Sequence, residues 1–598
     1  MMSDFNPREK QFETDITAYM TAEGGFKAGN ATAFDRRLGL DTATLISFVK
    51  ATQPKKWEAY SRLYSNPEKA FVDRFNRVVH LEGLLSVLRY GFSDRGIKFR
   101  VVYWKPNTTL NPDDQIRYEA NILHCTRQLR YSVHNENSID VVLFVNGIPV
   151  VSMELKDQFT GQNVNNAIEQ YRFDRASNDA IFAFTERVLV HFAVDLTNVY
   201  MTTRLQGSAT RFLPFNQGSN GPGIDGGKGN PDNPDGYDTD YLWKSVLTHD
   251  RLLELLQKYM HLSEEVDQDT GEIKKSMIFP RYHQLDVVTY LLNQVRQNGT
   301  GESYLVQHSA GSGKSNSIAW LAYRLADLHD ADDNAIFHSV IVVTDRRVLD
   351  SQLQDTVYQF DHEEGEVVKV DKHSDQLRDA INDGARIIIT TLQKFPVIYQ
   401  QVEANNRKFA IIIDEAHSSQ TGDAAKKLKR ALADTEDILA AYAAMEAEEE
   451  KTHKDSEDKI IEEIAAHGKH QNLSFFAFTA TPKDKTLQMF GIPYDGDDGK
   501  RKYRPCHVYS MHQAIDEGFI LDVLKNYMSF NVYFKIIKSI PDNPELDSVQ
   551  GIRAIRNYTS FHPHNIASKV SIMLDHFRNV TMHKINGKAK AMVVTSSR

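Results

Sequence analysis

The stretch Tyr304-Leu-Val-Gln-His-Ser-Ala-Gly-Ser-Gly-Lys-Ser315 decides the fold of this chain, because an apolar strand leads directly into a glycine-rich loop. The glycines let backbone N–H groups approach phosphate oxygens, and the helix predicted after the loop adds the positive end of its dipole. Lys314 is predicted to reach the β- and γ-phosphates of a nucleotide, and the Ser315 hydroxyl to bind Mg²⁺. A chance match in a flexible loop is the alternative, since His308 stands where the complete motif has glycine. The predicted phosphate cradle consists of Gly311, Ser312, Gly313, Lys314 and Ser315.

Two more apolar strands are predicted to end in polar residues. Phe409–Ile413 leads into Asp414 and Glu415, and an acidic pair at the tip of a buried strand is costly unless it meets a cation. Asp414 is therefore predicted to hold Mg²⁺, and Glu415 to orient and deprotonate the attacking water. The strand Phe475–Phe478 leads into a second polar tip. Because ligands bind at the carboxyl ends of parallel strands, the tips supply three further candidate nucleotide contacts, His417, Thr479 and Thr481.

These three stretches, in this order, resemble motifs I, II and III of superfamily 2 helicases and translocases. The resemblance implies ATP hydrolysis by RecA-like lobes. Gln284 resembles the Q element of that superfamily, because its amide can pair with donor and acceptor edges of adenine. A solvent-facing glutamine is the alternative. The family contacts the DNA backbone from strand ends, which here offer Arg346, Thr390 and Thr391.

A second group of candidate catalytic residues lies in a predicted hairpin. Asn146-Gly147 between two β-rich runs is a strong hairpin signal. Asp140 begins the first strand, while Glu154 and Lys156 lie two residues apart on the second and therefore share a face. Two carboxylates at the open end of a hairpin are predicted to bind Mg²⁺, with the ammonium stabilising developing charge. A surface hairpin with charges at its mouth is the alternative.

Counting residues along this hairpin sets a condition on the metal site. With a plain two-residue loop, residue 145 pairs with 148 and Asp140 pairs with Met153, so Asp140 and Glu154 point to opposite faces. The site therefore requires one extra residue. It could come from a three-residue loop with Gly147 in a left-handed conformation, or from a bulge in either strand.

The hairpin resembles the PD-(D/E)xK nuclease core, and its place before the motor resembles the restriction (R) subunit of type I restriction–modification enzymes. The resemblance implies ATP-driven translocation on double-stranded DNA, Mg²⁺-dependent cleavage away from the recognition site, and methyltransferase (M) and specificity (S) subunits as partners. Tyr171 fits the tyrosine of that family's Gln-x-x-x-Tyr element and is a further catalytic candidate. Ala167 stands at its glutamine position. Whether Gln170 or Arg172 substitutes is open, as is a packing role for Tyr171.

Composition fits an ordinary soluble protein. The net charge of the 598 residues is −10, so contacts to DNA must come from local basic surfaces. Candidates lie within 426–430 and 500–504, and solvated faces are the alternative. Two cysteines are too few for a disulfide framework or a zinc site, which suits a reducing cytoplasm, and no apolar run reaches membrane length.

The predicted fold class is α/β, with two kinds of domain. Residues 1–205 form a PD-(D/E)xK endonuclease-like domain, and 206–260 a linker with connecting helices. Residues 261–503 form the first RecA-like lobe, with a helical insertion at about 435–470. Residues 504–598 begin a second lobe that we expect to be incomplete, because no arginine-finger motif appears. A helicase or remodelling ATPase with a non-catalytic DNA-binding domain is the alternative function, and an assembly subunit with silent sites is a third.

Overall fold

The computed structural model describes residues 7–266, 271, 273–344, 357, 367–370, 374–391, 407–414, 471–496, 499–522, 563–582 and 589–593. The chain divides into two compact units, Met1–Gln513 and Ala514–Arg598. Across these described residues, no helix combines the length and apolar character needed to cross a membrane.

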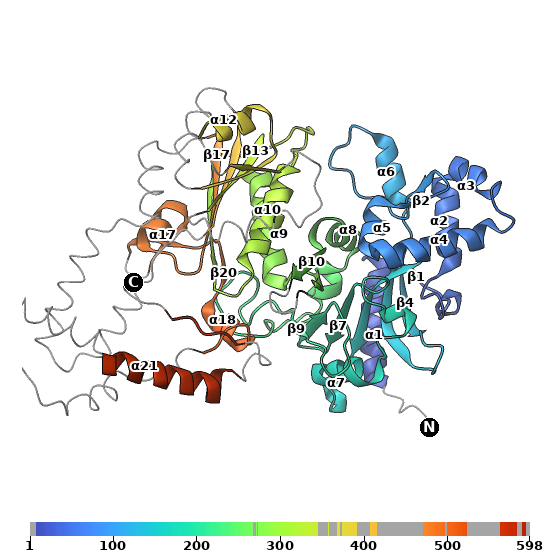
Figure 1. The fold of residues 1–598 in the computed structure, drawn as a ribbon, viewed down its shortest axis with the longest axis horizontal. Helices are drawn as coiled ribbons and strands as arrows, with labels where there is room; N and C mark the ends of the chain where they lie inside the picture. The colour runs from blue at the N-terminus through green and yellow to red at the C-terminus, as the bar shows by residue number, and fades with distance from the viewer. Residues whose placement is uncertain are drawn as a thin grey trace, which may run out of the picture. The chain divides into compact units, whose positions relative to one another are not determined.

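Within the described residues, the first domain is built on a mixed seven-stranded sheet of order β1-β4-β5-β6-β7-β8-β9 (Figure 1). The β1–β4 and β6–β7 pairs are parallel and the other neighbours are antiparallel. The strands are β1 (Lys27–Ala28), β4 (Leu123–Arg130), β5 (Ser138–Val145), β6 (Ile148–Leu155), β7 (Val190–Val194), β8 (Val199–Thr202) and β9 (Leu213–Pro214).

Helices cover both faces of this sheet. α1 (Pro7–Ala22) packs on a core that includes Val141 and Leu143, whereas α7 (Val164–Glu169) packs on a core that includes Val142 and Phe144. Neighbouring strand residues point to opposite faces, so β5 contributes to both cores. Burial on both sides explains why β5 and β6 are almost continuously apolar in sequence.

The β5–β6 hairpin contains the extra residue that the metal site requires. Asn146 and Gly147 form a two-residue turn with φ of 51° and 83°. The register then shifts: Phe144 pairs with Pro149, but Leu143 pairs with Val151. The extra residue is therefore a bulge in β6, and the prediction of an added residue is confirmed. Beyond it Val141 pairs with Met153, which directs β5 position 140 towards position 154.

The connecting region 206–260 packs against the first domain instead of forming a free tether. β9 extends the sheet, Phe215 is fully buried, and Trp243 joins the core. Asn216 Oδ1 accepts the Val199 N–H at 2.8 Å, so the loop also satisfies backbone groups at the sheet edge. The elements that follow the loop are η5 (Leu242–Val246), α8 (His249–Glu254), η6 (Leu255–Tyr259), β10 (His261–Val266) and β11 (Ile273–Ile278).

The second domain is built on a sheet whose described neighbours are all parallel, in the order β14-β15-β13-β16-β17-β12-β20. A fully parallel sheet confirms the α/β fold class. Its strands are β12 (Ser303–His308), β13 (Ser339–Thr344), β14 (Val367–Val370), β15 (Ile387–Thr391), β16 (Phe409–Ile413), β17 (Leu473–Thr479) and β20 (His507–Tyr509).

Helices lie on both faces of the parallel sheet as well. α9 (Tyr282–Asn298) and α10 (Lys314–Ala326) run together along one face, while α12 (Ser374–Asn382) and α17 (Asp484–Phe490) contribute to the core of the other (Figure 1). β20 belongs to this sheet, although the sequence places residues from 504 onward in the second lobe. Its pairing with β12 extends the first unit to Gln513.

In the second unit the described elements include α21 (Pro563–His576) and the short turn η9 (Phe577–Thr581). The sequence predicts a strand near the end of the chain. Residues 589–593, which are the described part of that stretch, adopt no regular secondary structure. The predicted helical insertion at 435–470 lies outside the described residues.

Candidate functional site

The mouth of the β5–β6 hairpin brings together the three residues predicted from the nuclease motif. Asp140 Oδ2 accepts the backbone N–H of Leu155 at 2.8 Å, so Asp140 lies against the end of β6, beside Glu154 and Lys156. All three side chains are nearly buried. Asp140 also raises the pKa of Glu154, because two nearby carboxylates disfavour each other's ionisation. The spatial grouping expected from the hairpin is therefore present.

Glu154 is the most deeply buried of these groups. Its Oε1 accepts the Nε–H of Arg175 at 2.6 Å, and the two side chains are 0% and 3% exposed. Burial raises the pKa of Glu154 to about 8, Arg175 opposes that rise, and Asp140 adds to it. The second oxygen, Oε2, is buried and has no hydrogen-bond partner among the described residues.

Gln128, which the motifs do not predict, holds Asp140 from the other side. Gln128 Nε2 donates to Asp140 Oδ1 and to Glu13 Oε2, both at 3.0 Å. Arg127 Nε donates to the other Glu13 oxygen at 2.6 Å. Gln128 has a φ of 46° in the middle of β4, a left-handed conformation that is costly for a non-glycine residue. Strain of this kind persists where surrounding contacts determine the geometry, and here those contacts serve the site.

Tyr171 lies under the sheet and away from solvent. Its hydroxyl shares a 2.8 Å hydrogen bond with Ser152 Oγ, which also bonds His191 Nδ1 at 2.8 Å. Burial lowers the pKa of His191 to about 3, so the imidazole is neutral. Tyr171 is therefore placed to support β6. Of the two candidate substitutes for the missing glutamine, Arg172 donates to the carbonyl of Thr210, and the buried Gln170 Oε1 has no partner in the described structure.

The hairpin mouth fits a divalent cation in part. Carboxylate oxygens are the ligands that Mg²⁺ prefers, and the orphaned Oε2 of Glu154 is a buried acceptor that a cation would satisfy. In the part of the chain that the structure describes, no group of three or more His, Cys, Asp or Glu side chains is arranged to hold a metal. Asp140 and Glu154 would therefore share a metal with water, backbone or phosphate oxygens.

The glycine-rich loop has the geometry of a phosphate cradle. Gly311 and Gly313 have φ of 75° and 77°, and Gly313 is the N-cap of α10. Lys314 Nζ bends back to the carbonyls of His308 and Ser309 at 3.3 and 3.5 Å. The buried Ser312 Oγ has no partner among the described residues. Backbone donors, a helix N-terminus and an ammonium group thus converge on one loop.

His308 replaces the glycine of the complete motif without opening the loop. It is fully buried and its Nε2 lies 2.9 Å from Nδ1 of His507, whose Nε2 lies 3.0 Å from Asp286 Oδ2. A carboxylate accepts, so His507 donates to Asp286 and in turn accepts from His308. Burial lowers the pKa of His308 well below its usual value, which keeps this imidazole neutral. The chain of contacts ties the loop to β20 and α9.

Gln284 contacts the loop. Its Oε1 accepts the Arg281 N–H at 2.9 Å, and its Nε2 donates to the carbonyls of Ser312 and Gly313 at 3.1 and 2.9 Å. The amide thereby anchors the glycine loop to the start of α9. Its predicted contact with adenine stays a prediction.

Sheet order places the other predicted motor residues beside the loop. β16, β17 and β12 are neighbours, so Asp414 after β16 and Thr479 at the end of β17 lie at the same edge as the cradle. The Thr481 N–H donates to Thr479 Oγ1 at 3.3 Å. Glu415, His417 and Arg346 lie outside the described residues, as does the side chain of Thr391. Thr390 is 1% exposed, which keeps its hydroxyl away from the surface.

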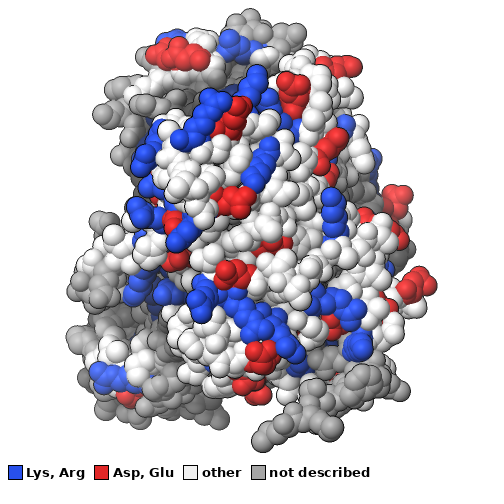
Figure 2. All heavy atoms as spheres, turned by 90° about the vertical axis from the view of Figure 1, so that its right-hand side faces the viewer, with Lys and Arg blue, Asp and Glu red and all other residues white. Residues whose placement is uncertain are grey.

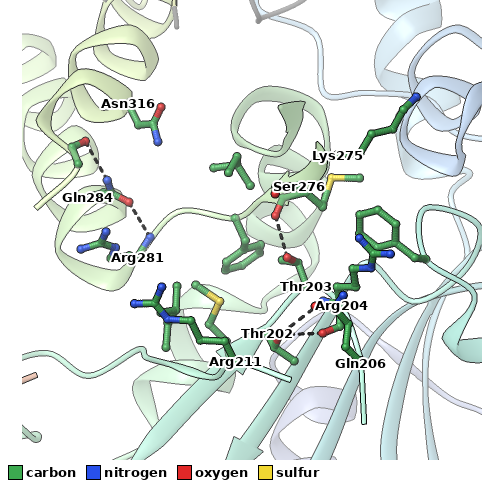
Figure 3. Close-up of a pocket in the computed structure, with 17 residues that line it drawn as sticks. Thr202, Thr203, Arg204, Gln206, Arg211, Lys275, Ser276, Arg281, Gln284 and Asn316 are labelled. Carbon is green, nitrogen blue, oxygen red and sulfur yellow. Dashed lines mark hydrogen bonds between the residues drawn. The ribbon is translucent and has the colours of Figure 1, made fainter. Parts of the chain in front are cut away.

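A cavity of about 410 Å³ opens between the loop and the first domain (Figure 3). Arg281, Gln284 and Asn316 line it from α9 and α10, while the opposite wall comes from β8, the stretch after it and β11. Its charged lining residues are all basic, and apolar side chains such as Met277 and Phe279 line it as well, a combination that suits a nucleoside. The charged residues are Arg204, Arg211, Lys275 and Arg281.

Local basic surfaces are present although the net charge of the chain is negative. Residues 50–100 contain eleven Lys and Arg against five Asp and Glu. Figure 2 shows a face on which Lys and Arg side chains gather in a diagonal band. Of the clusters predicted from sequence, 426–430 lies outside the described residues, and the other lies on the exposed hairpin of β18 (Ile492–Asp495) and β19 (Arg501–Arg504).

Two family models match the chain, one on each domain. The model described as "Type I restriction enzyme R protein N terminus" matches residues 53–210, which include the hairpin. The model described as "SWI2/SNF2 ATPase" matches residues 283–463, which include the glycine loop. Together with the curated relatives, these matches support an R subunit of a type I restriction enzyme. The recognition made from the motifs is confirmed.

Curated R-subunit relatives support the same assignment. The chain is 23% identical over 442 residues to the endonuclease subunit SsaAORF53P of Staphylococcus saprophyticus, which covers 71% of this chain and 39% of the relative. It is 25% identical over 420 residues to the endonuclease subunit SauCOLORF180P of Staphylococcus aureus strain COL, and the match covers 68% of this chain and 37% of the relative. It is also 25% identical over 401 residues to the HindI endonuclease subunit of Haemophilus influenzae, and the match covers 64% of this chain and 32% of that subunit. The chain thus spans less than half the length of these relatives.

Among solved structures, the chain is similar to an HsdR-subunit fragment from Vibrio vulnificus YJ016, with 14% identity, a TM-score of 0.26, and 67% of this chain and 57% of that chain covered. It is also similar to a Sulfolobus solfataricus SWI2/SNF2 ATPase core in complex with dsDNA, with 14% identity and a TM-score of 0.21. That match covers 34% of this chain and 32% of the other chain. At these scores the likeness does not establish a shared arrangement of domains.

Proposed function

We propose that this chain carries the ATP-driven DNA translocase and the Mg²⁺-dependent endonuclease of a type I restriction enzyme. The substrate is double-stranded DNA that lacks the host modification, cut away from the recognition site. The supporting observation is that one compact unit holds both a carboxylate–lysine hairpin mouth and a phosphate cradle. The proposed partners are the M and S subunits of the same complex, and the proposed compartment is the cytoplasm.

At the nuclease site, Asp140 and Glu154 hold the metal and Lys156 acts on the scissile phosphate. Lys156 is only 8% exposed, so its ammonium would stabilise developing negative charge where solvent screening is weak. Tyr171 supports β6 through Ser152. When bound, Mg²⁺ supplies a Lewis acid that polarises the phosphodiester at this site and neutralises the nucleotide phosphates in the motor.

In the motor, Lys314 exchanges its backbone carbonyl partners for nucleotide phosphates, and Ser315 and Asp414 hold the metal. Glu415 acts as the base for the attacking water. The base end of ATP points to the cavity beside Gln284, because this cavity adjoins the loop and combines apolar and basic walls.

The proposal is tested on the enzyme assembled with M and S subunits. Asp140→Asn is expected to abolish cleavage of unmodified plasmid while DNA-stimulated ATP turnover continues, because the two sites use separate residues. Lys314→Ala is expected to abolish ATP turnover, since the phosphates lose their ammonium contact. ATP turnover that persists in the Lys314 variant would remove the motor assignment. A wild-type enzyme that turns over ATP but never cuts DNA would instead favour a helicase or remodelling ATPase with a non-catalytic first domain.

A further inference from the structure

Arg175 is a buried guanidinium at the nuclease hairpin to which no motif gives a role. It follows the turn η3 (Gln170–Asp174), and its Nε donates to Glu154 Oε1 at 2.6 Å. Its Nη2 donates to the carbonyl of Ser138 at 2.8 Å, and its guanidinium lies 5.5 Å from the centre of the Tyr131 ring. Contacts to a carboxylate, a carbonyl and an aromatic ring fix the planar group.

The pairing of Arg175 with Glu154 is asymmetric. Arg175 occupies one carboxylate oxygen, while Oε2 is buried and unpaired among the described residues. A buried ion pair usually costs free energy unless its remaining acceptors are satisfied. An unpaired oxygen beside a second carboxylate, Asp140, is instead the arrangement that a cation would complete.

We propose that Arg175 is the positioning residue for the metal-binding carboxylate Glu154, a role that neither Gln170 nor Arg172 fills. Arg175 holds Oε1, so that Oε2 is directed to the metal. The inference rests on the proposed nuclease function. It also supplies a reason why the chain tolerates Ala167 at the glutamine position of the Gln-x-x-x-Tyr element.

Loss of Arg175 has a consequence for the metal site. Without the guanidinium, Oε1 loses the donor that fixes it, so the Glu154 carboxylate is free to rotate and Oε2 is no longer held in one orientation. Residues that orient a metal ligand typically change metal affinity about 10–100-fold when they are replaced. Metal affinity is therefore expected to fall in a variant that still folds.

The experiment is a calorimetric titration of the full chain with MnCl₂ or MgCl₂, without nucleotide or DNA, with thermal unfolding of each variant as the check on folding. Asp140→Asn identifies the heat that belongs to the hairpin site. Arg175→Met removes the charge, and Arg175→Lys keeps the charge but loses the planar fork. Arg172→Met is the matched control, because Arg172 is a neighbouring arginine that donates to the carbonyl of Thr210.

Arg175→Met is expected to weaken metal binding about 10–100-fold. Arg175→Lys should restore part of the affinity, and Arg172→Met should match wild type. An unchanged affinity in folded Arg175→Met overturns the inference, and so does an equal loss in Arg172→Met. If Arg175→Met does not fold, an Arg175→Lys affinity identical to wild type also overturns it, because a lysine lacks the Nε that holds Oε1. Wild-type protein without any Asp140-dependent metal binding would instead refute the proposed nuclease itself.

Discussion

Replacing Gly313 by alanine tests whether Gln284 and the glycine loop form one rigid unit. Gly313 has a φ of 77°, which costs an alanine about 1–2 kcal/mol. Its added Cβ would lie 2.4 Å from Gln284 Nε2, so one of the two must move. Gln284 is 3% exposed and held by hydrogen bonds to Arg281, Ser312 and Gly313. Each bond contributes about 0.5–1.5 kcal/mol net, so loss of the two bonds that Nε2 donates costs roughly another 1–3 kcal/mol.

The combined cost of about 2–5 kcal/mol corresponds to a loss of nucleotide affinity of roughly 30-fold to several thousand-fold. The assay is fluorescence anisotropy with a labelled ATP analogue on the full chain, with thermal unfolding as the check on folding. Gln284→Ala alone removes the anchoring bonds. The double variant relieves the steric part of the Gly313→Ala defect, so the two substitutions should cost at least about 1 kcal/mol less together than their sum. Strict additivity would refute the proposed contact, and wild-type affinity in Gly313→Ala would refute the cradle geometry.

Two further predictions concern stability. Because burial raises the pKa of Glu154 from 4.5 to about 8, the folded state binds the extra proton, and stability is lost as pH rises between these values. Glu154→Gln should remove this dependence, so urea midpoints of wild type and variant should diverge between about pH 4.5 and 8, and parallel curves would contradict the shift. Asn146→Ala should destabilise the first domain by about 3–5 kcal/mol, since it removes three hydrogen bonds in a buried environment and places alanine at a φ of 51°. Asn146→Gly, which accepts that φ, should cost about 1 kcal/mol less in the same urea experiment, and equal losses would show that backbone strain is unimportant.

The glycine loop could be predicted from sequence because its chemistry is local. Strand, glycines, Lys314 and the following helix are consecutive, and each sets the conformation of the next. The all-parallel sheet followed from apolar runs with polar tips, since such strands must be buried on both faces. The role of His308 could not be predicted in this way, because its partners His507 and Asp286 come from distant strand and helix positions.

The strand register of the β5–β6 hairpin could be predicted in part from the sequence. The two-residue periodicity of strands required one extra residue between Asp140 and Glu154, and the structure places a bulge in β6. The sequence did not distinguish a longer loop from a bulge in either strand as the source of that residue. The choice depends on the neighbours: an added Cβ at Gly147 would lie 2.3 Å from the Asp41 carbonyl, so the turn is confined by the chain packed against it.

Sequence alone determined which residue types meet at each site, because motif spacing and strand periodicity act over short stretches. Tertiary structure decided how those residues are held. Arg175 and Gln128 carry no motif, yet they contact the carboxylates from other elements of the fold. A buried charge must be compensated by whatever group the fold brings next to it, and spacing along the chain does not record that neighbour.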